Sequence, residues 1–107
     1  LGLIYSEGQG VPQDYKEAAK WFRLAAEQGK ASAQVNLGLM YHQGQGVFQD
    51  YVLAHMWLNI ATANADSEKQ KKFIETRNLV AKNMTASQIV EAQELARKCT
   101  ANKFKGC

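Results

Sequence analysis

Residues that could act as metal ligands, acids, bases or nucleophiles are few in this chain of 107 residues. The two histidines are His42 and His55, and neither has a cysteine or carboxylate at a spacing that would complete a metal site. The ten acidic residues are scattered, and no pair stands out for general acid–base catalysis. No Gly-x-Ser-x-Gly or Ser-x-x-Lys nucleophile motif occurs. We therefore expect no catalytic residue, no metal site and no cofactor.

The two cysteines, Cys99 and Cys107, allow two interpretations. The residues between them include Gly106 and are numerous enough to turn the chain back, so a disulfide is feasible. Such a bond would indicate an oxidising compartment, and therefore a periplasmic or secreted protein. The alternative is a pair of free thiols in a cytoplasmic protein.

The composition is that of a small folded domain, with 46% hydrophobic residues, 21% charged residues and a net charge of +3. This balance excludes intrinsic disorder and a strong general affinity for polyanions. No apolar stretch approaches the length of about 18–20 residues that crosses a bilayer. The basic residues gather after residue 64, but no aromatic residues alternate with them as single-stranded nucleic acid binding would require. We expect no nucleic acid partner and no membrane insertion.

The chain repeats itself with an offset of 36 residues, which is the spacing between Gly2 and Gly38 (38 − 2). A period of about 34–36 residues is typical of a helix–turn–helix repeat. The matched positions of the first copy include Leu1, Gly2, Tyr5, Gly8, Gly10, Asp14, Ala18, Trp21 and Ala25. Their counterparts in the second copy are Leu37, Gly38, Tyr41, Gly44, Gly46, Asp50, Ala54, Trp57 and Ala61.

Each repeated position has a predicted structural role. Glycines favour the left-handed conformation that ends a helix, so the predicted turn glycines are Gly8, Gly10, Gly44 and Gly46. Predicted helix N-caps are Asp14, Asp50 and Thr85, the last within a capping box formed with Gln88. Small and aromatic residues should form the packed core of the repeats. This predicted core comprises Gly2, Tyr5, Ala18, Trp21, Leu37, Gly38, Tyr41, Ala54 and Trp57.

The repeated pattern resembles the Sel-one-like repeat (SLR), a relative of the tetratricopeptide repeat. The pattern reads Ala-x-x-x-Leu-Gly-x-x-Tyr-x-x-Gly-x-Gly-Val-x-x-Asp-x-x-x-Ala-x-x-Trp-x-x-x-Ala, and residues 33–61 match every fixed position. Residues 1–25 match all of them except the leading alanine. The resemblance implies antiparallel helix pairs stacked into a curved solenoid that binds other proteins rather than catalysing a reaction.

The predicted fold is an all-α, right-handed α-α superhelix, forming a single solenoid domain over residues 1–107. Residues 1–29 would be an N-terminally truncated first unit, and residues 30–65 a complete second unit. Residues 66–107 would form a helical pair and a tail that cap the C-terminal end, because the last interface of a solenoid needs a polar cover. Leu1 corresponds to Leu37, which lies inside its helix, so we expect the chain to begin partway through a repeat unit.

The resemblance also implies a binding surface, because the first helix of each unit lines the concave face of tetratricopeptide-like solenoids. The corresponding positions are Leu3, Ser6 and Glu7 in the first copy and Ser32, Val35, Leu39, His42 and Gln43 in the second. We therefore expect an adaptor that binds an unidentified protein or peptide.

Two alternatives remain open at the level of the sequence. One is a secreted enzyme of the cysteine-rich SLR type acting on cell-wall or β-lactam compounds, although neither repeat here contains a cysteine. The other is self-association of like chains through exposed repeat ends.

Overall fold

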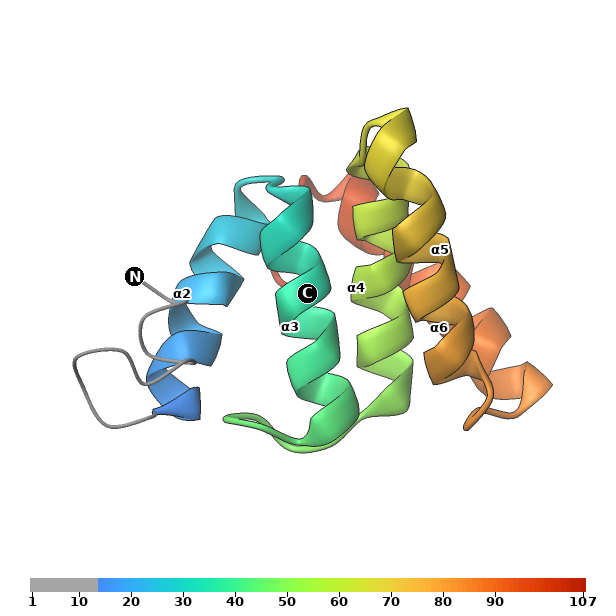
Figure 1. Ribbon diagram of the computed structural model, residues 1–107, viewed down its shortest axis with the longest axis horizontal. Helices are drawn as coiled ribbons and strands as arrows, with labels where there is room; N and C mark the ends of the chain where they lie inside the picture. The colour runs from blue at the N-terminus through green and yellow to red at the C-terminus, as the bar shows by residue number, and fades with distance from the viewer. Residues whose placement is uncertain (1–13) are drawn as a thin grey trace.

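The computed structural model describes residues 14–107, which form five helices and no strand (Figure 1). The helices are α2 (Tyr15–Glu27), α3 (Ala31–Gln43), α4 (Tyr51–Asn64), α5 (Ser67–Ala81) and α6 (Ala86–Ala101). Helices α2, α3, α4 and α5 follow one another as neighbours joined by short connections, and α6 packs against α4. This is the arrangement of an all-α helical repeat solenoid. The expected elements that involve residues 1–13, among them Gly2, Tyr5, Gly8 and Gly10, lie outside the described residues.

Side-chain caps fix where several of these helices begin. The Asp14 carboxylate accepts a hydrogen bond from the Glu17 backbone N–H at 3.1 Å. The Asp50 carboxylate does the same for Leu53 at 3.0 Å. Thr85 and Gln88 form a reciprocal capping box at the start of α6. The three predicted N-caps are therefore confirmed, and each satisfies a backbone donor that has no partner within its helix.

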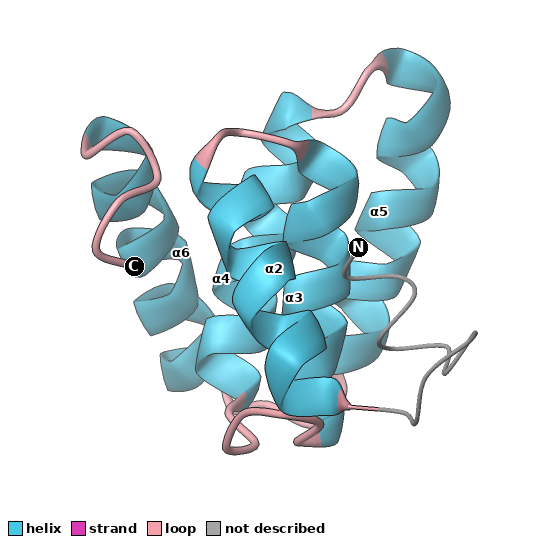
Figure 2. Cartoon of the chain, turned by 90° about the vertical axis from the view of Figure 1, so that its left-hand side faces the viewer, coloured by secondary structure: helices cyan, strands magenta, loops and turns pink. Residues whose placement is uncertain are grey.

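Helix α4 is the centre of the fold. It packs against α3, α5 and α6, while α3 also packs against α2. In the view of Figure 2, α5 and α6 lie on opposite sides, and α4 packs against both of them. Because neighbours surround α4, most of its middle is buried, including Ala54, Trp57, Leu58, Ile60 and Ala61. This long buried segment accounts for the apolar character of the second helix in the repeat pattern.

Gly38 lies in the middle of α3 at the closest approach of α3 to α4. A Cβ atom at this position would lie 3.0 Å from the Ala54 carbonyl oxygen and 3.1 Å from Leu58 Cγ. Glycine lowers helix propensity by about 1 kcal/mol relative to alanine, so the tight interhelical contact is the compensation. Gly38 and Ala54, two of the predicted core residues, therefore lie at the same interhelical contact.

Trp21 is the least buried of the predicted core residues that the structure describes. Its side chain is 36% exposed, whereas its counterpart Trp57 is completely buried. Among the described helices α2 packs mainly against α3, and α4 has three neighbours. The tryptophan at this repeat position is therefore fully buried in one unit and partly exposed in the other. The remaining predicted core residues in the described part are buried: Ala18, Leu37, Gly38, Tyr41, Ala54 and Trp57.

Gln34 is a buried polar residue that the repeat pattern did not indicate. Its side chain is fully buried and donates through Nε2 to the Ala26 carbonyl at 3.0 Å. Its Oε1 accepts from Asn64 Nδ2 at 3.1 Å. The Gln34 amide thus connects α2, α3 and the end of α4. Both of its polar atoms are hydrogen-bonded, which offsets the free-energy cost of burying them.

The loop between α3 and α4 is held against the start of α2. Gly44 caps α3 in the left-handed conformation, and Gly46 also has a positive φ of 76°. A Cβ atom at Gly46 would clash with the Tyr15 carbonyl group, which no side chain tolerates. The two predicted turn glycines of the second copy are therefore confirmed, and at Gly46 a close backbone contact adds to the conformational requirement.

Replacing Gly46 with alanine should destabilise the fold more than the same change at a glycine with free space. Gly106 is the matched control, because its φ is 74° and a Cβ there would meet nothing closer than 3.9 Å. We expect Gly106→Ala to cost about 1 kcal/mol from backbone conformation alone. Gly46→Ala should cost at least about 2 kcal/mol more, since the loop must also move off Tyr15. Urea unfolding followed by circular dichroism measures both, and equal costs would contradict the tight contact.

The C-terminal tail folds back and is tied to α6. Helix α6 continues to Ala101, and the tail then turns at Lys103 and Phe104, both with positive φ. A disulfide joins Cys99 to Cys107, with their Cα atoms 5.7 Å apart. The Phe104 ring lies against Gly29 in the turn between α2 and α3. The tail therefore connects the last helix to the turn that begins the second unit.

Candidate interaction surface

Helix α3 presents one face that the core does not use. Within residues 31–43 the buried side chains are Ala33, Gln34, Leu37, Met40 and Tyr41, and their spacing leaves the opposite face for other contacts. On that face Ser32 and Gln43 are exposed, and Val35, Leu39 and His42 are half-buried. The five candidate residues of the second copy thus share one side of a single helix.

The lower end of this face is hollowed. A cavity of about 230 Å³ is lined by Leu39 and Gln43 of α3 together with Tyr15 and Phe22 of α2. The His42 ring packs near the Tyr51 ring at the start of α4, with 5.5 Å between the ring centroids. The surface therefore offers apolar contact at Leu39, an amide at Gln43 and a histidine whose ring is held in place by a neighbouring helix.

Helix α5 carries residues at the repeat positions that correspond to part of the α3 face. Adding the 36-residue offset to Val35, Leu39 and Gln43 leads to Lys71, Glu75 and Leu79. All three are exposed, and Leu79 is 59% exposed although it is a large apolar residue. The repeat pattern fades after Asn64, so only the offset itself could have indicated these positions.

A partly buried polar chain lies between α4 and α5. Arg77 Nη1 donates to Asn59 Oδ1 at 3.0 Å, so the Asn59 amide nitrogen points the other way, 2.9 Å from His55 Nδ1. This arrangement makes Nδ1 of His55 an acceptor, which requires a neutral imidazole. Burial, and then the positive charge of Arg77, lower the pKa of His55 below its ordinary value of 6.5.

The lowered pKa of His55 predicts that the protein loses stability in mild acid. Below pH 6.5 the unfolded chain binds a proton at this position that the folded chain does not, so stability falls with pH until the folded histidine is also protonated. In that window the free energy of unfolding should change by up to about 1.4 kcal/mol per pH unit from this group. Urea unfolding across pH 5–7.5 measures the slope.

His55→Gln is the variant that should remove this contribution, and His42→Gln is the matched control that should keep it. A slope that is identical in the wild type and in His55→Gln would contradict the role assigned to the partly buried polar chain of Arg77, Asn59 and His55.

The described residues hold no group of three or more His, Cys, Asp or Glu side chains placed to bind a metal ion. None of the described helices is long and apolar enough to cross a membrane. Leu3, Ser6 and Glu7, the candidate surface residues of the first copy, lie outside the described residues.

The stacked helix pairs, the repeated glycine-rich turn and the exposed face of α3 define an α-helical repeat protein. The Sel1 repeat model matches residues 1–30 and 31–66. The chain therefore belongs to the Sel1 repeat family, as the resemblance of its repeats indicated. Sel1 repeat proteins are generally protein-interaction modules, and the fold is typically a non-catalytic scaffold.

Two solved structures are similar to this chain. One is a protective antigen present in uropathogenic Escherichia coli strains and displaying an SLR fold, with 38% identity over 97% of this chain and a TM-score of 0.84. The other is a Sel1 repeat protein from Oxalobacter formigenes, with 38% identity over 67% of this chain and a TM-score of 0.61. The chain spans only 22% and 30% of the lengths of these two proteins. Comparison with curated proteins finds no match.

Proposed function

We propose that this chain is a non-catalytic interaction module that binds a peptide or protein on the concave face of its repeats. The observation that carries the proposal is the free face of α3, where Ser32, Val35, Leu39, His42 and Gln43 stand on one side of a rigid helix. Leu3, Ser6 and Glu7 would continue this surface in the first copy.

The chemistry of the face suits a peptide better than a small molecule. It is open, mixes apolar and amide groups, and carries no cluster of ionised side chains on α3. Leu39 supplies an apolar anchor point beside a shallow hollow, and Gln43 can donate and accept hydrogen bonds with a peptide backbone. Lys71, Glu75 and Leu79 of α5 would lengthen the contact and add charge selectivity.

Substituting Leu39 tests this proposal. Leu39→Glu places a charge in the apolar part of the face, and Gln43→Ala removes its amide, so the pair should lower partner affinity at least about a hundredfold. The measurement is affinity capture from cells that express the protein, followed by mass spectrometry and titration of the captured partner. Leu24→Glu is the matched control, because Leu24 is 44% exposed on α2. Unchanged affinity in the Leu39→Glu, Gln43→Ala variant would refute the concave-face assignment.

Self-association is a second candidate, supported by the exposed apolar residues Trp21 and Leu24 on α2. Two exposed apolar side chains three positions apart on one helix invite contact with a like surface. Light scattering at several concentrations would show a rising mass for this candidate and a constant monomer mass for an adaptor.

An oxidising compartment, periplasmic or extracellular, is the location that we propose for the protein. The support is the Cys99–Cys107 disulfide, which is the kind of bond that persists outside the reducing cytoplasm.

A further inference from the structure

Phe48 is an aromatic residue displayed on the surface without a packing role. Its side chain is 96% exposed, the highest value among the large hydrophobic residues exposed in residues 14–107. The repeat pattern leaves its position free, and the first copy has Pro12 there (48 − 36). Neither the repeat nor the core requires an aromatic ring at this point. The ring is informative because it lies beside other apolar residues, Val47 and Leu53, in one patch.

The loop that carries Phe48 is rigidly held. The Asp50 N–H donates to the Tyr41 carbonyl at 3.0 Å, and Gln49 Nε2 donates to the His42 carbonyl at 2.9 Å. On the other side Gly46 is in close backbone contact with Tyr15 of α2. A ring presented on a loop fixed at both ends loses little conformational entropy when it enters an interface.

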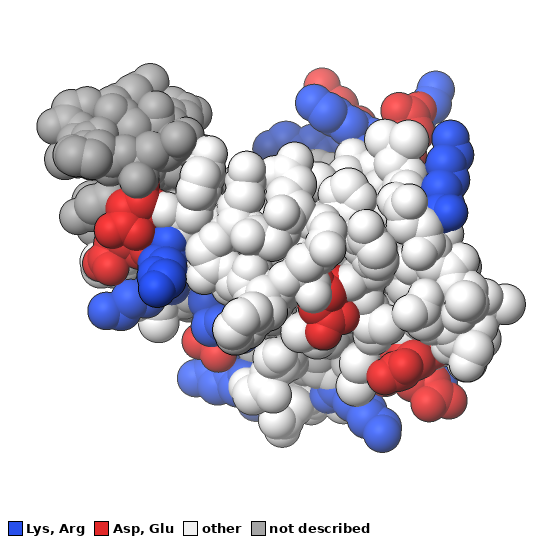
Figure 3. All heavy atoms as spheres, turned by 90° about the horizontal axis from the view of Figure 1, so that it is seen from below, with Lys and Arg blue, Asp and Glu red and all other residues white. Residues whose placement is uncertain are grey.

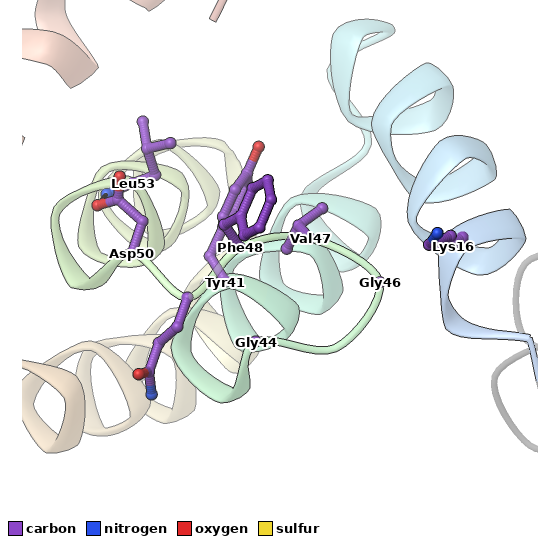
Figure 4. A pocket seen from close by; sticks show the side chains of 9 residues that line it. Lys16, Tyr41, Gly44, Gly46, Val47, Phe48, Asp50 and Leu53 are labelled. Atoms are coloured by element: carbon purple, nitrogen blue, oxygen red, sulfur yellow. Dashed lines mark hydrogen bonds between the residues drawn. The ribbon is translucent and has the colours of Figure 1, made fainter.

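A broad hollow adjoins this ring, between α2 and α4. Its volume is about 830 Å³, and Tyr41, Val47, Phe48 and Leu53 supply its apolar lining. Figure 4 shows Val47, Phe48 and Tyr41 between Leu53 on α4 and Lys16 on α2. The face of the molecule seen from below, which bears this loop, has its charged side chains mainly toward the edges (Figure 3). The hollow is large enough for one or two peptide side chains.

The α2 wall of the hollow is basic. Lys16 lines it, and Lys20 and Arg23 follow on the same side of the helix at spacings of four and seven residues. Arg23 is engaged with the Tyr41 hydroxyl, but neither Lys16 nor Lys20 forms an ion pair within the part of the chain that the structure describes. On the opposite wall the Asp50 carboxylate is occupied as the N-cap of α4. Asp50 keeps its negative charge, and the excess positive charge comes from the three basic residues on this side of α2.

From this combination we propose a second docking surface, separate from the concave face, that binds a peptide segment of a partner protein with a large apolar residue flanked by Asp or Glu. The apolar residue enters the hollow and stacks on Phe48. The flanking carboxylates lie along α2 and pair with Lys16 and Lys20. The surface lies at the α3–α4 loop, so the module can hold two segments at once.

A random 12-residue peptide library displayed on phage and panned against the whole chain tests this proposal. Depleting the library on the Phe48→Ala variant first selects for peptides that need the ring. We expect the enriched peptides to combine a large apolar residue with at least one Asp or Glu within three positions. In titrations of synthetic copies Phe48→Ala should weaken binding about tenfold or more. Lys16→Gln should weaken it several-fold and reduce its dependence on salt.

Two controls separate this surface from the concave face and from loss of folding. Val90→Ala removes another exposed apolar side chain, on α6, and should leave peptide affinity unchanged, as should Leu39→Glu. The Phe48→Ala chain should melt at the wild-type temperature because the ring is exposed. The proposal is overturned if no peptide is enriched, if enriched peptides lack acidic residues, or if they bind Phe48→Ala as tightly as the wild type. Concentration-dependent dimerisation that Phe48→Ala abolishes would identify a second copy as the occupant and also overturn it.

Discussion

Trp57→Ala should lower the free energy of unfolding by about 3–5 kcal/mol, the range for removing a large aromatic side chain from a packed core. Trp57 is completely buried at the centre of α4, which α3, α5 and α6 surround. The substitution would leave a cavity that three helices cannot close without losing their other contacts. Urea or thermal unfolding followed by circular dichroism measures the loss.

The matched control is Trp21→Ala, the same change at the same repeat position. Trp21 is 36% exposed, so its removal should cost about 1–2 kcal/mol and leave a difference of at least about 2 kcal/mol between the two variants. Equal losses would contradict the account of how the two units are packed.

A second variant covers the case in which Trp57→Ala does not fold. The indole Nε1 of Trp57 is buried without a hydrogen-bond partner within the described residues. Trp57→Phe removes this unpaired donor, whose burial costs about 1–3 kcal/mol, while keeping much of the ring volume. We therefore expect Trp57→Phe to cost less than about 2 kcal/mol, because the smaller cavity and the removed donor partly offset one another.

Breaking the Cys99–Cys107 disulfide should have the second largest effect. The bond closes a loop with a sequence separation of 8 residues, and loop-closure entropy assigns such a crosslink about 2.5 kcal/mol. The double variant Cys99→Ser, Cys107→Ser should lose this amount plus part of the packing of Phe104 on Gly29. Unfolding with and without a reducing agent provides the measurement, and the wild type in reductant should resemble the double variant.

Phe104→Ala separates the two contributions of the tail, since it removes the ring and keeps the crosslink. Its cost should depend on whether the disulfide is intact, because a free tail already lacks the ring contact. If reduction changes the free energy of unfolding by less than about 0.5 kcal/mol, the tail does not hold the fold together as described.

Much of the fold could be predicted from the sequence because the repeat contains the residues that begin and end its helices. Asp14 and Asp50 are followed by helices, and Gly44 ends α3 in the left-handed conformation. Each of these signals is local, depending on one residue and its nearest backbone neighbours. The similarity of the second repeat to the first then indicated a repeated helix pair, which local signals alone cannot show.

The exposure of Trp21 could not be predicted, because burial depends on how many helices surround a position. The repeat assigns Trp21 and Trp57 the same role, yet among the described helices α4 has three neighbours and α2 packs mainly against α3. The burial of Gln34 could not be predicted for a related reason. Its hydrogen-bond partners, Ala26 and Asn64, are distant in the sequence and come together only in the fold.

The candidate surface was predictable to the level of one helix face. Ser32, Val35, Leu39, His42 and Gln43 do lie on one side of α3, as a helical period requires. The hollow beside Phe48 was not predictable, because it forms between α2, α4 and a loop whose path depends on the contact of Gly46 with Tyr15.

Site-specific photo-crosslinking in cells that produce the protein tests the central claim, binding on the concave face, most directly. A photoreactive phenylalanine analogue would be placed in turn at Leu39, at Gln43 and, as a control on another surface, at Leu24. If the partner binds on the concave face, we expect a discrete crosslinked partner protein from Leu39 and Gln43 and none from Leu24. Crosslinking of the same partner from Leu24 alone, or an equal yield from all three positions, would contradict it.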